Sequence, residues 1–243
     1  MPTIKENLDI WDLKYDWSKN GDEWTGQAKI CNIPYEEWRG SIAKYFIYPN
    51  INKHSTVLEI GPGHGRWTAY ILKNAKKAIL VDLSPNCISF CKKRFTDFNN
   101  ITYFVNNGKD LSFIKSESID FIWSYDVFVH IEPNAIADYF SEFRRILKKD
   151  GKAIIHHANR KHWSLPLLPS LFKFRLLGRI PAAMISMNKV WDGWRSQVSK
   201  ELISSLALKA NLLVQKQTNT WGENNKYKVP RFNDYISILI NKK

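Results

Sequence analysis

The chain lacks the segments that carry a protein into or across a membrane. No apolar run reaches the roughly 18 uncharged residues of a spanning helix. The first residues lack the apolar core of a signal peptide. Cysteine is scarce, and Cys31, Cys87 and Cys91 have no metal-ligand spacing. We therefore expect a cytoplasmic protein with reduced thiols, buried small residues at 87 and 91, and no metal site.

Acidic residues are rare in the last third of the chain. Residues 161–243 contain 14 basic and 4 acidic side chains, whereas residues 1–56 contain 7 and 8. A positive field attracts anionic substrates, nucleic acid or an anionic membrane, and a solvated lysine-rich surface is the alternative. Within this third, residues 161–190 hold no acid and several aromatic residues. They predict a cap that binds an anionic acceptor or makes peripheral membrane contact; a packed cap or a contact within a homo-oligomer remains open.

Strand-like and helix-like stretches alternate along most of the chain. This alternation predicts an α/β fold with a doubly wound parallel sheet. Residues 1–30 form an arm with tryptophans at 11, 17 and 24, which either packs on the domain or covers a substrate. A helix follows between Pro34 and Pro49. The expected strands are 57–60, 78–82, 101–105, 119–124, 152–157, 212–220 and 235–240, and the expected helices are 66–75, 85–95, 133–149 and 199–210.

Residues 57–67 combine a short strand, a glycine-rich turn and the start of a helix. This arrangement is typical of a nucleotide site. A dinucleotide fingerprint needs a third glycine where Arg66 stands. Glu59 precedes the turn, and Asp82 ends the next strand with a carboxylate that can accept two ribose hydroxyls. An acid near the loop suits a sulfonium and an ammonium, so the pattern favours S-adenosylmethionine over NAD.

At these motifs the chain resembles the class I S-adenosylmethionine-dependent methyltransferases. Residues 59–65 match the first motif of that family, 81–85 its acidic ribose-binding turn, and 119–126 its fourth-strand motif. Residues 106–108 stand where the family contacts adenine, with asparagine where that turn often has aspartate.

The resemblance implies a Rossmann-like doubly wound seven-stranded sheet, mostly parallel with one antiparallel last strand. An N-terminal helical arm and helix at 1–50 would pack on a methyltransferase domain at 51–243, which carries an inserted cap at 160–198. By resemblance, the cofactor is S-adenosyl-L-methionine and the product S-adenosyl-L-homocysteine. The residues implied in cofactor binding are Glu59, Gly61, Gly63, Gly65, Asp82, Leu83, Asn107, Gly108 and Ser124.

Candidate catalytic residues follow the fourth and fifth strands, where α/β sheets bind ligands. A hydroxyl nucleophile needs a base, and histidine is suited to that role. Side chains alternate along a strand, so His156 and His157 point to opposite faces. We expect His157 to face the pocket because it lies nearer the strand end. Asp126, His130 and His156 are the other candidates, and we expect His64 to border the cofactor.

Four short runs are similar to a bacterial subgroup associated with glycan and cell-surface polysaccharide synthesis. They are residues 15–17, 124–131, 155–159 and 221–222. We therefore expect O-methylation of a sugar hydroxyl or terminal phosphate of a glycan, glycolipid or precursor, in the cytoplasm or at the inner face of the membrane. The alternatives are a small-molecule or RNA methyltransferase, or an inactive cofactor-binding scaffold. Nucleic acid is disfavoured because the run after the fourth strand, Ser-Tyr-Asp-Val, lacks the Pro-Pro-Tyr type of motif.

Overall fold

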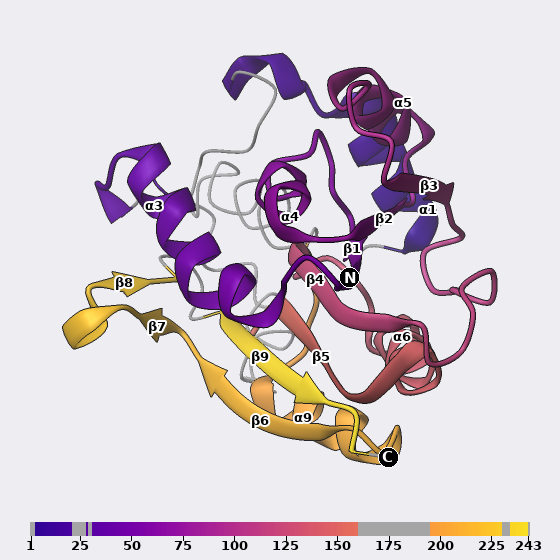
Figure 1. The fold of residues 1–243 in the computed structure, drawn as a ribbon. Coiled ribbons are helices and arrows are strands. Elements are labelled where there is room, and N and C mark those ends of the chain that lie inside the picture. The colour runs from indigo at the N-terminus through magenta and orange to yellow at the C-terminus, as the bar shows by residue number, and fades with distance from the viewer. Residues whose placement is uncertain (1–2, 21–27, 29–30, 160–194, 230–233, 243) are drawn as a thin grey trace, which may run out of the picture.

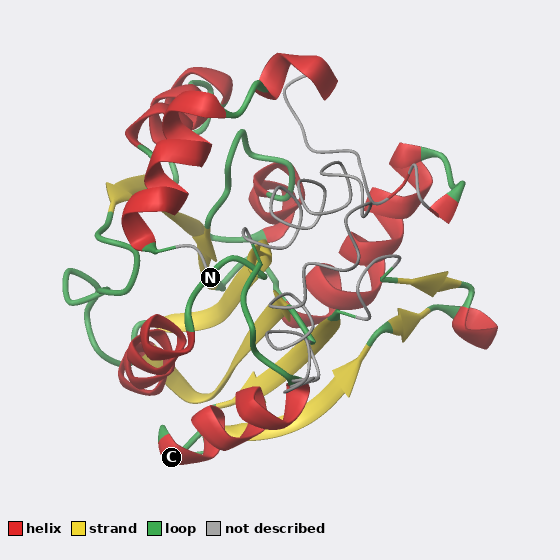
Figure 2. Ribbon diagram, turned by 180° about the vertical axis from the view of Figure 1, so that it is seen from behind, coloured by secondary structure: helices red, strands yellow, loops and turns green. Residues whose placement is uncertain are grey.

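A single mixed sheet organises the domain (Figures 1 and 2). The computed structural model describes residues 3–20, 28, 31–159, 195–229 and 234–242. Seven strands pair in the order β3-β2-β1-β4-β5-β9-β6, and β9 runs antiparallel to both of its neighbours. The predicted fold class is confirmed. The strands are β1 (Thr56–Ile60), β2 (Lys77–Asp82), β3 (Ile101–Val105), β4 (Ile119–Phe128), β5 (Leu147–His157), β6 (Leu213–Thr218) and β9 (Tyr235–Ile240).

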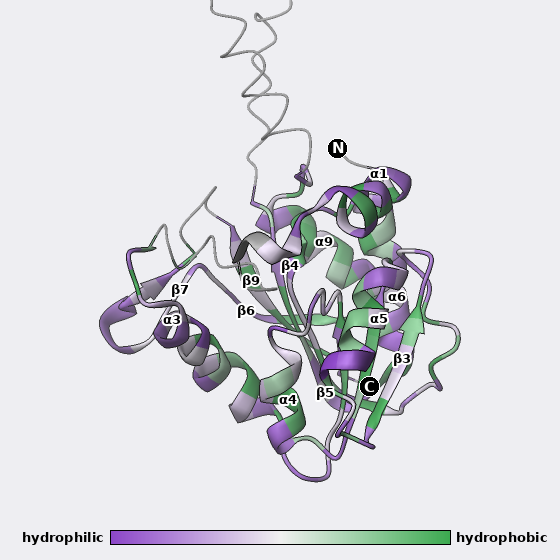
Figure 3. Ribbon diagram, turned by 90° about the horizontal axis from the view of Figure 1, so that it is seen from above, coloured by the Kyte–Doolittle hydropathy of each residue, from purple (hydrophilic) through white to green (hydrophobic). Residues whose placement is uncertain are grey.

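Helices cover both faces of the sheet. One apolar cluster packs α3, η3, α4 and α5 on one face, and a second packs α6 and α9 on the other. Figure 3 shows α3 and α4 on one side of the strands and α6 and α9 on the other. The helices are α3 (Tyr35–Ile42), η3 (Ala43–Ile47), η4 (Tyr48–Asn50), α4 (Thr68–Asn74), α5 (Pro85–Arg94), α6 (Pro133–Ile146) and α9 (Lys200–Lys209).

Local sequence sets where these helices begin. Ser84 accepts a hydrogen bond from the amide of Cys87 at 3.0 Å, and Pro85 occupies the first position of α5. Ser199 caps α9 in the same way through the amide of Leu202. Cys87 and Cys91 are buried free thiols on the inner side of α5, as predicted.

Three strands depart from the sequence prediction. β4 runs on to Phe128 instead of ending at 124, and its pairing with β5 shifts register between Ser124 and Phe128. β5 begins at Leu147, which pairs with Ile119, so the preceding helix ends before the predicted residue 149. Leu147 is fully buried where it pairs with Ile119. The predicted strand 212–220 is divided into β6 and β7 (Thr220–Trp221); β7 pairs with β8 (Tyr227–Lys228) across η5 (Glu223–Asn225).

The N-terminal arm folds into three short helices beside α5 (Figure 1). A capping box between Thr3 and Glu6 starts the first of them. None of the helices in the described ranges is long and apolar enough to span a membrane. Trp24 and residues 160–194 of the predicted cap lie outside the described residues. The three helices are α1 (Ile4–Leu8), η1 (Asp9–Lys14) and η2 (Trp17–Asn20).

Candidate active site

The glycine turn after β1 is packed too closely for side chains. Gly61 has φ +67°, and a Cβ there would lie 2.3 Å from Cγ2 of Val127. Gly63 has φ +55°, and a Cβ there would lie 2.7 Å from the ring of Trp17. Gly65 completes the turn with φ +87°. Only glycine suits such close approach at positive φ. The turn lies between β4 and the arm, and we call the turn, together with Glu59 and Asp82, the cradle.

Glu59 places a buried acid at the foot of this cradle. One carboxylate oxygen accepts a hydrogen bond from Oγ1 of Thr68 at 2.6 Å, and the other has no partner among the described residues. Burial raises the pKa of Glu59 to about 8. An unpaired buried carboxylate oxygen suits a ligand that brings a cation, such as the ammonium of S-adenosylmethionine. The residues present therefore fit this cofactor.

Asp82 closes the next part of the cradle at the end of β2. Its Oδ2 accepts a hydrogen bond from the amide of Gly63 at 3.1 Å, and its Oδ1 accepts one from the amide of Ser84 at 2.9 Å. Burial raises the pKa of Asp82 to about 6. Because each carboxylate oxygen has two lone pairs, Asp82 can still accept hydrogen bonds from two ribose hydroxyls. Leu83, between these contacts, is half-buried.

The turn after β3 is shaped by its own asparagines. Asn106 accepts from the amide of Gly108 and donates to the hydroxyl oxygen of Tyr139 at 2.9 Å. Asn107 accepts from the amides of Lys109 and Asp110 and is exposed. The structure thus places Asn107 and Gly108 beside the Asp82 end of β2, through the bond from the Asn106 amide to the Asp82 carbonyl.

Ser124 joins the glycine turn to β4. Its hydroxyl is buried and donates to the carbonyl of Ile60 at 2.9 Å, directly before Gly61. The predicted cofactor residues therefore lie along the carboxyl ends of β3, β2, β1 and β4, which are adjacent in the sheet in that order.

The arm lies against each part of this cradle. The carboxylate of Asp12 accepts hydrogen bonds from the hydroxyl of Ser84 and the amide of Asn86. Trp17 stacks on His64, with ring centroids 4.5 Å apart, and His64 stacks in turn on Phe90 of α5. The sequence left open whether the tryptophans pack on the domain or cover a substrate, and these contacts show that Trp17 packs on the domain.

The same arm reaches the residues that follow β4. Asn7 donates to the carbonyl of His130 at 2.9 Å, and Trp11 lies 5.0 Å from the His130 ring. Ile4 contacts the position of Gly108, where a Cβ would lie 3.0 Å from its Cγ2. The contacts of Asn7, Asp12 and Ile4 were not predicted, because no sequence spacing relates the arm to the strands that it touches.

A buried charged network lies beside the cradle. The register shift in β4 gives Asp126 a φ of +64° and directs its carboxylate between Arg66 and His156. Arg66 lies 2.7 Å from Oδ2 of Asp126, and Nδ1 of His156 lies 3.1 Å from Oδ1. On the far side of the imidazole, Nε2 of His156 lies 3.6 Å from Oδ2 of Asp234, which also pairs with Arg195.

Two features of this network bear on proton transfer. His156 is fully buried, and its Nε2 has no hydrogen-bond partner in the described part of the chain. Burial raises the pKa of Asp126, but the Arg66 guanidinium and the contact with His156 outweigh it and hold that pKa well below its usual range. Asp126 is therefore an ionised partner of His156 and a poor base itself.

His157 occupies a different environment from the one expected. It is buried, its Nδ1 lies 2.7 Å from the Ala158 carbonyl, and its Nε2 lies 2.7 Å from the Ser237 hydroxyl. Burial lowers its pKa to about 3. With both ring nitrogens engaged within the sheet, His157 has none to offer an acceptor. The two histidines do point to opposite faces, and we revise the expected base from His157 to His156.

Three residues of the network were not predicted as site residues. In the sequence, Arg66 stands out only because it replaces a glycine, and nothing marks Arg195 or Asp234. No regular spacing links positions 66, 195 and 234, because loops bring them together beside the carboxyl ends of β4 and β5. Within the described residues, no group of three or more histidine, cysteine or acidic side chains could hold a metal ion.

Comparison with known proteins finds a matching family model over part of the chain and several distant relatives. Residues 57–151 match a family model described as a methyltransferase domain. A demethylmenaquinone methyltransferase of Tropheryma whipplei is 25% identical over 166 residues, which cover 65% of this chain and 66% of that protein. A squalestatin hexaketide synthase of a Phoma species is 26% identical over 184 residues, or 68% of this chain, but the chain spans only 7% of that protein's length.

Solved structures share the fold. Magnesium protoporphyrin IX methyltransferase from Synechocystis, determined with bound S-adenosylhomocysteine, aligns over 98% of this chain and 99% of its own, with a TM-score of 0.65 and 14% identity. Geranyl diphosphate C-methyltransferase from Streptomyces coelicolor aligns over 100% and 99%, with a TM-score of 0.64 and 13% identity. At such identities the likeness shows the fold.

Proposed function

We propose that this chain, whose residues 57–151 carry a methyltransferase domain on the class I S-adenosylmethionine-dependent fold, transfers the methyl group of S-adenosylmethionine to a hydroxyl of its acceptor. The observation that carries the proposal is His156. It is buried between the carboxylates of Asp126 and Asp234, beside the glycine turn, and its Nε2 has no hydrogen-bond partner among the described residues. This is the arrangement of an oriented general base.

The donor would be held by the cradle. The unpaired oxygen of Glu59 would face the ammonium, and Asp82 would accept the ribose hydroxyls. The turn at residues 106–108 would border the adenine, and Trp17 of the arm would close the cradle above Gly63. When bound, the cofactor supplies the methyl group already activated on a positively charged sulfur.

The residues of the acceptor side then have two tasks. They must hold the acceptor oxygen in line with the methyl group and take its proton as the new bond forms. When Nδ1 carries the ring proton toward Oδ1 of Asp126, 3.1 Å away, Nε2 of His156 has the lone pair that would accept the acceptor's proton. The imidazolium that results faces Asp234 on one side and Asp126 on the other, so both carboxylates stabilise it.

The charges of the network favour a neutral acceptor over an anionic one. Arg66 is paired with Asp126 and Arg195 with Asp234, so the described network has no excess positive charge for a phosphate. Of the two acceptor groups expected from the sequence, this supports a sugar hydroxyl of a cell-surface glycan or its precursor. The cap at 161–190, expected to contact that acceptor, lies outside the described residues.

A small-molecule acceptor is the second candidate. It is favoured by the similarity to the demethylmenaquinone methyltransferase, which extends over 65% of this chain. The ribosomal RNA methyltransferase of Coxiella burnetii, by contrast, matches only 25% of the chain. For a small molecule that presents a hydroxyl, His156 would take the proton as it would from a sugar.

The test is a matched pair of substitutions at adjacent positions. Purified protein is incubated with methyl-labelled S-adenosylmethionine and a panel of glycosides, polyprenyl-linked sugars and quinols, and S-adenosylhomocysteine affinity is measured by calorimetry. We expect His156→Gln to reduce transfer about 1000-fold with unchanged affinity, because it removes the base. His157→Gln should retain transfer to within about threefold.

If His157→Gln lost methyl transfer and His156→Gln retained it, the base would be His157. Failure of the wild-type protein to bind S-adenosylhomocysteine would contradict the donor assignment itself. Transfer to a quinol but to no sugar would select the second candidate.

A further inference from the structure

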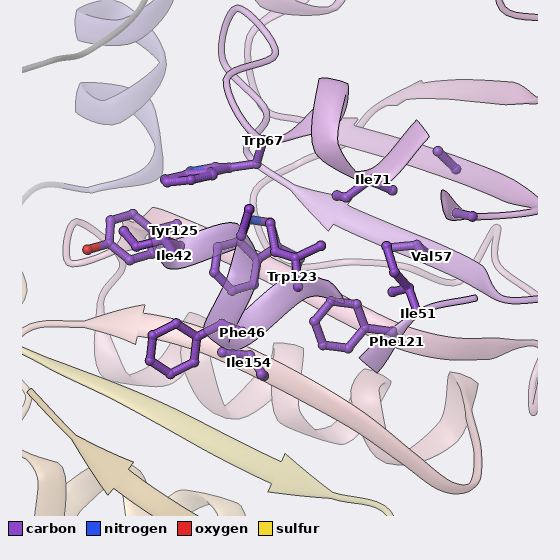
Figure 4. Packing of buried hydrophobic residues seen from close by; sticks show 14 of the residues in the cluster. Ile42, Phe46, Ile51, Val57, Trp67, Ile71, Phe121, Trp123, Tyr125 and Ile154 are labelled. Carbon is purple, nitrogen blue, oxygen red and sulfur yellow. The ribbon is translucent and has the colours of Figure 1, made fainter. Parts of the chain in front are cut away.

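Arg66 is the only member of the charged network that belongs to the glycine turn's own segment, one residue after Gly65. Its side chain is 9% exposed. The guanidinium carbon lies 4.8 Å from the ring centroid of Trp67, 5.7 Å from that of Tyr125 and 5.9 Å from that of Trp38. Figure 4 shows the Trp67 ring above that of Tyr125 at the edge of the core. Arg66 is therefore a cation held among aromatic faces.

The ion pair with Asp126 keeps this buried cation charged. Burial alone would lower the pKa of Arg66, but Asp126 outweighs it and the pKa is raised. The pair is reciprocal, since Arg66 also holds the pKa of Asp126 down. Oδ2 of Asp126 is fixed by Arg66, which leaves Oδ1 to face His156.

Nδ1 of His156 meets two competing partners. The backbone amide of Asp126 lies 3.2 Å away and can donate to a bare Nδ1. Oδ1 of Asp126 lies 3.1 Å away and can accept from a protonated one. The first contact would place the ring proton on Nε2, which could then not act as a base. The second places the proton on Nδ1 and leaves Nε2 unprotonated. On the other side, Asp234 at 3.6 Å is too distant for a hydrogen bond with Nε2.

The charge of Asp126 decides between these contacts. A hydrogen bond from Nδ1–H to an ionised carboxylate is about twice as strong as one from a backbone amide to a neutral nitrogen. That advantage exists only while Asp126 is ionised and its Oδ1 is held toward the ring. Arg66 provides both conditions.

We propose that Arg66 is a positioning residue that sets His156 in the tautomer with Nδ1 protonated and Nε2 bare. This rests on the proposed role of His156 as the base and adds the residue that makes it one. Because Arg66 directly follows the glycine turn, the same segment that would cradle the donor also prepares the base.

The tautomer can be observed without cofactor or acceptor. Nitrogen-15 NMR of the uniformly labelled full chain distinguishes protonated from bare ring nitrogens, and His156→Gln assigns the signal among the six histidines. Spectra are taken at about pH 8.5, above the ordinary titration range of histidine. In the wild type we expect the Nδ1–H form to exceed the other by about tenfold, as the charge-assisted bond implies.

Two substitutions of Arg66 distinguish the effect of its positive charge from that of its shape. Arg66→Gln should shift the majority to the Nε2–H form, and Arg66→Lys should keep the Nδ1–H form because it retains a positive charge. Arg39→Gln is the control: Arg39 also lies over two aromatic rings and pairs with Glu36, but it lies on α3 and should leave the tautomer unchanged.

A wild-type spectrum with Nε2 protonated overturns the proposal even if Arg66→Gln does not fold. So does an unchanged tautomer in a folded Arg66→Gln protein, whose fold is checked by thermal melting. Either result leaves donor binding and methyl transfer standing, since neither cofactor nor acceptor takes part. Loss of S-adenosylhomocysteine binding in the wild type, by contrast, overturns the proposed function and leaves the tautomer result intact.

Discussion

The two sides of the proposed site are built in different ways. The donor side, at the ends of β1, β2 and β3, consists of Glu59, Asp82 and the turns that follow them. Its side chains bond mainly to backbone amides and to the Thr68 hydroxyl. The acceptor side, at the ends of β4 and β5 and before β9, consists of charged side chains paired with one another: Asp126, His156, Asp234 and their arginines.

The two sides also differ in the charge states of their carboxyl groups. The donor side keeps its carboxyls partly neutral, because burial raises the pKa of both Glu59 and Asp82. On the acceptor side, Arg66 and His156 hold the pKa of Asp126 well below its usual range, whereas burial raises the pKa of Asp234 despite its pair with Arg195. Substitutions on the donor side should therefore change pH-dependent stability and cofactor affinity, and those on the acceptor side should change turnover.

The largest effect expected on the donor side is in the pH dependence of stability. The pKa of Glu59 is raised from 4.5 to about 8, so the folded protein holds this proton more tightly than the unfolded chain. That contribution is present below pH 4.5 and is lost as the pH rises toward 8. We expect the free energy of unfolding to fall by about 3 kcal/mol between about pH 5 and about pH 8.5.

Urea denaturation at a series of pH values measures this loss. In Glu59→Gln the loss should be much smaller, with a residual slope from Asp82, whose pKa is raised to about 6. Equal slopes in the two proteins would show that Glu59 is ionised at neutral pH and that the two sides do not differ in this respect.

The next largest effect concerns the ribose contact. Asp82→Ala should weaken S-adenosylhomocysteine binding about 100-fold, because two hydrogen bonds to an ionised carboxylate are lost. Calorimetry measures the S-adenosylhomocysteine affinity of each variant. Asp120→Ala is the matched control: Asp120 pairs with Lys148 and accepts from the Thr56 amide at the opposite ends of β4 and β1. Similar losses in both variants would point to general destabilisation of the sheet.

The smallest effect concerns the arm. Asp12→Ala removes the hydrogen bonds to Ser84 and Asn86 that hold the arm over the cradle, and S-adenosylhomocysteine should bind about tenfold more weakly. Asp9→Ala, in the same helix, loses only an exposed pair with Lys14 and should bind normally. An unchanged affinity in Asp12→Ala would show that the arm packs on the donor side without contributing to binding.

The same contrast explains how much could be predicted from the sequence. Strand and helix positions, and the turns with Glu59 and Asp82, follow from hydrophobic periodicity and from glycine, serine and proline at fixed offsets. These signals are local, because the residues that determine each turn lie within it. The seven-stranded, mostly parallel sheet then followed from a resemblance that these local motifs carried.

The acceptor side depends on contacts between distant segments. Which of His156 and His157 faces Asp126 is decided by the register shift in β4, and nothing in residues 124–128 indicates the two additional residues there. The pairs of Arg66 with Asp126 and Arg195 with Asp234 join residues 60 and 39 positions apart. Alternation along a strand predicted that the histidines diverge, but it could not say which one meets the acid.

The position of β9 has a consequence for how the molecule assembles. β9 follows β6 in the chain but lies between β5 and β6, so β6 cannot join the sheet until β9 has been made. A chain emerging from the ribosome can pair β1 to β5, and with them the cradle for the donor, before the last segment appears. Asp234 directly precedes β9, so the network around His156 is completed only in the final step of folding.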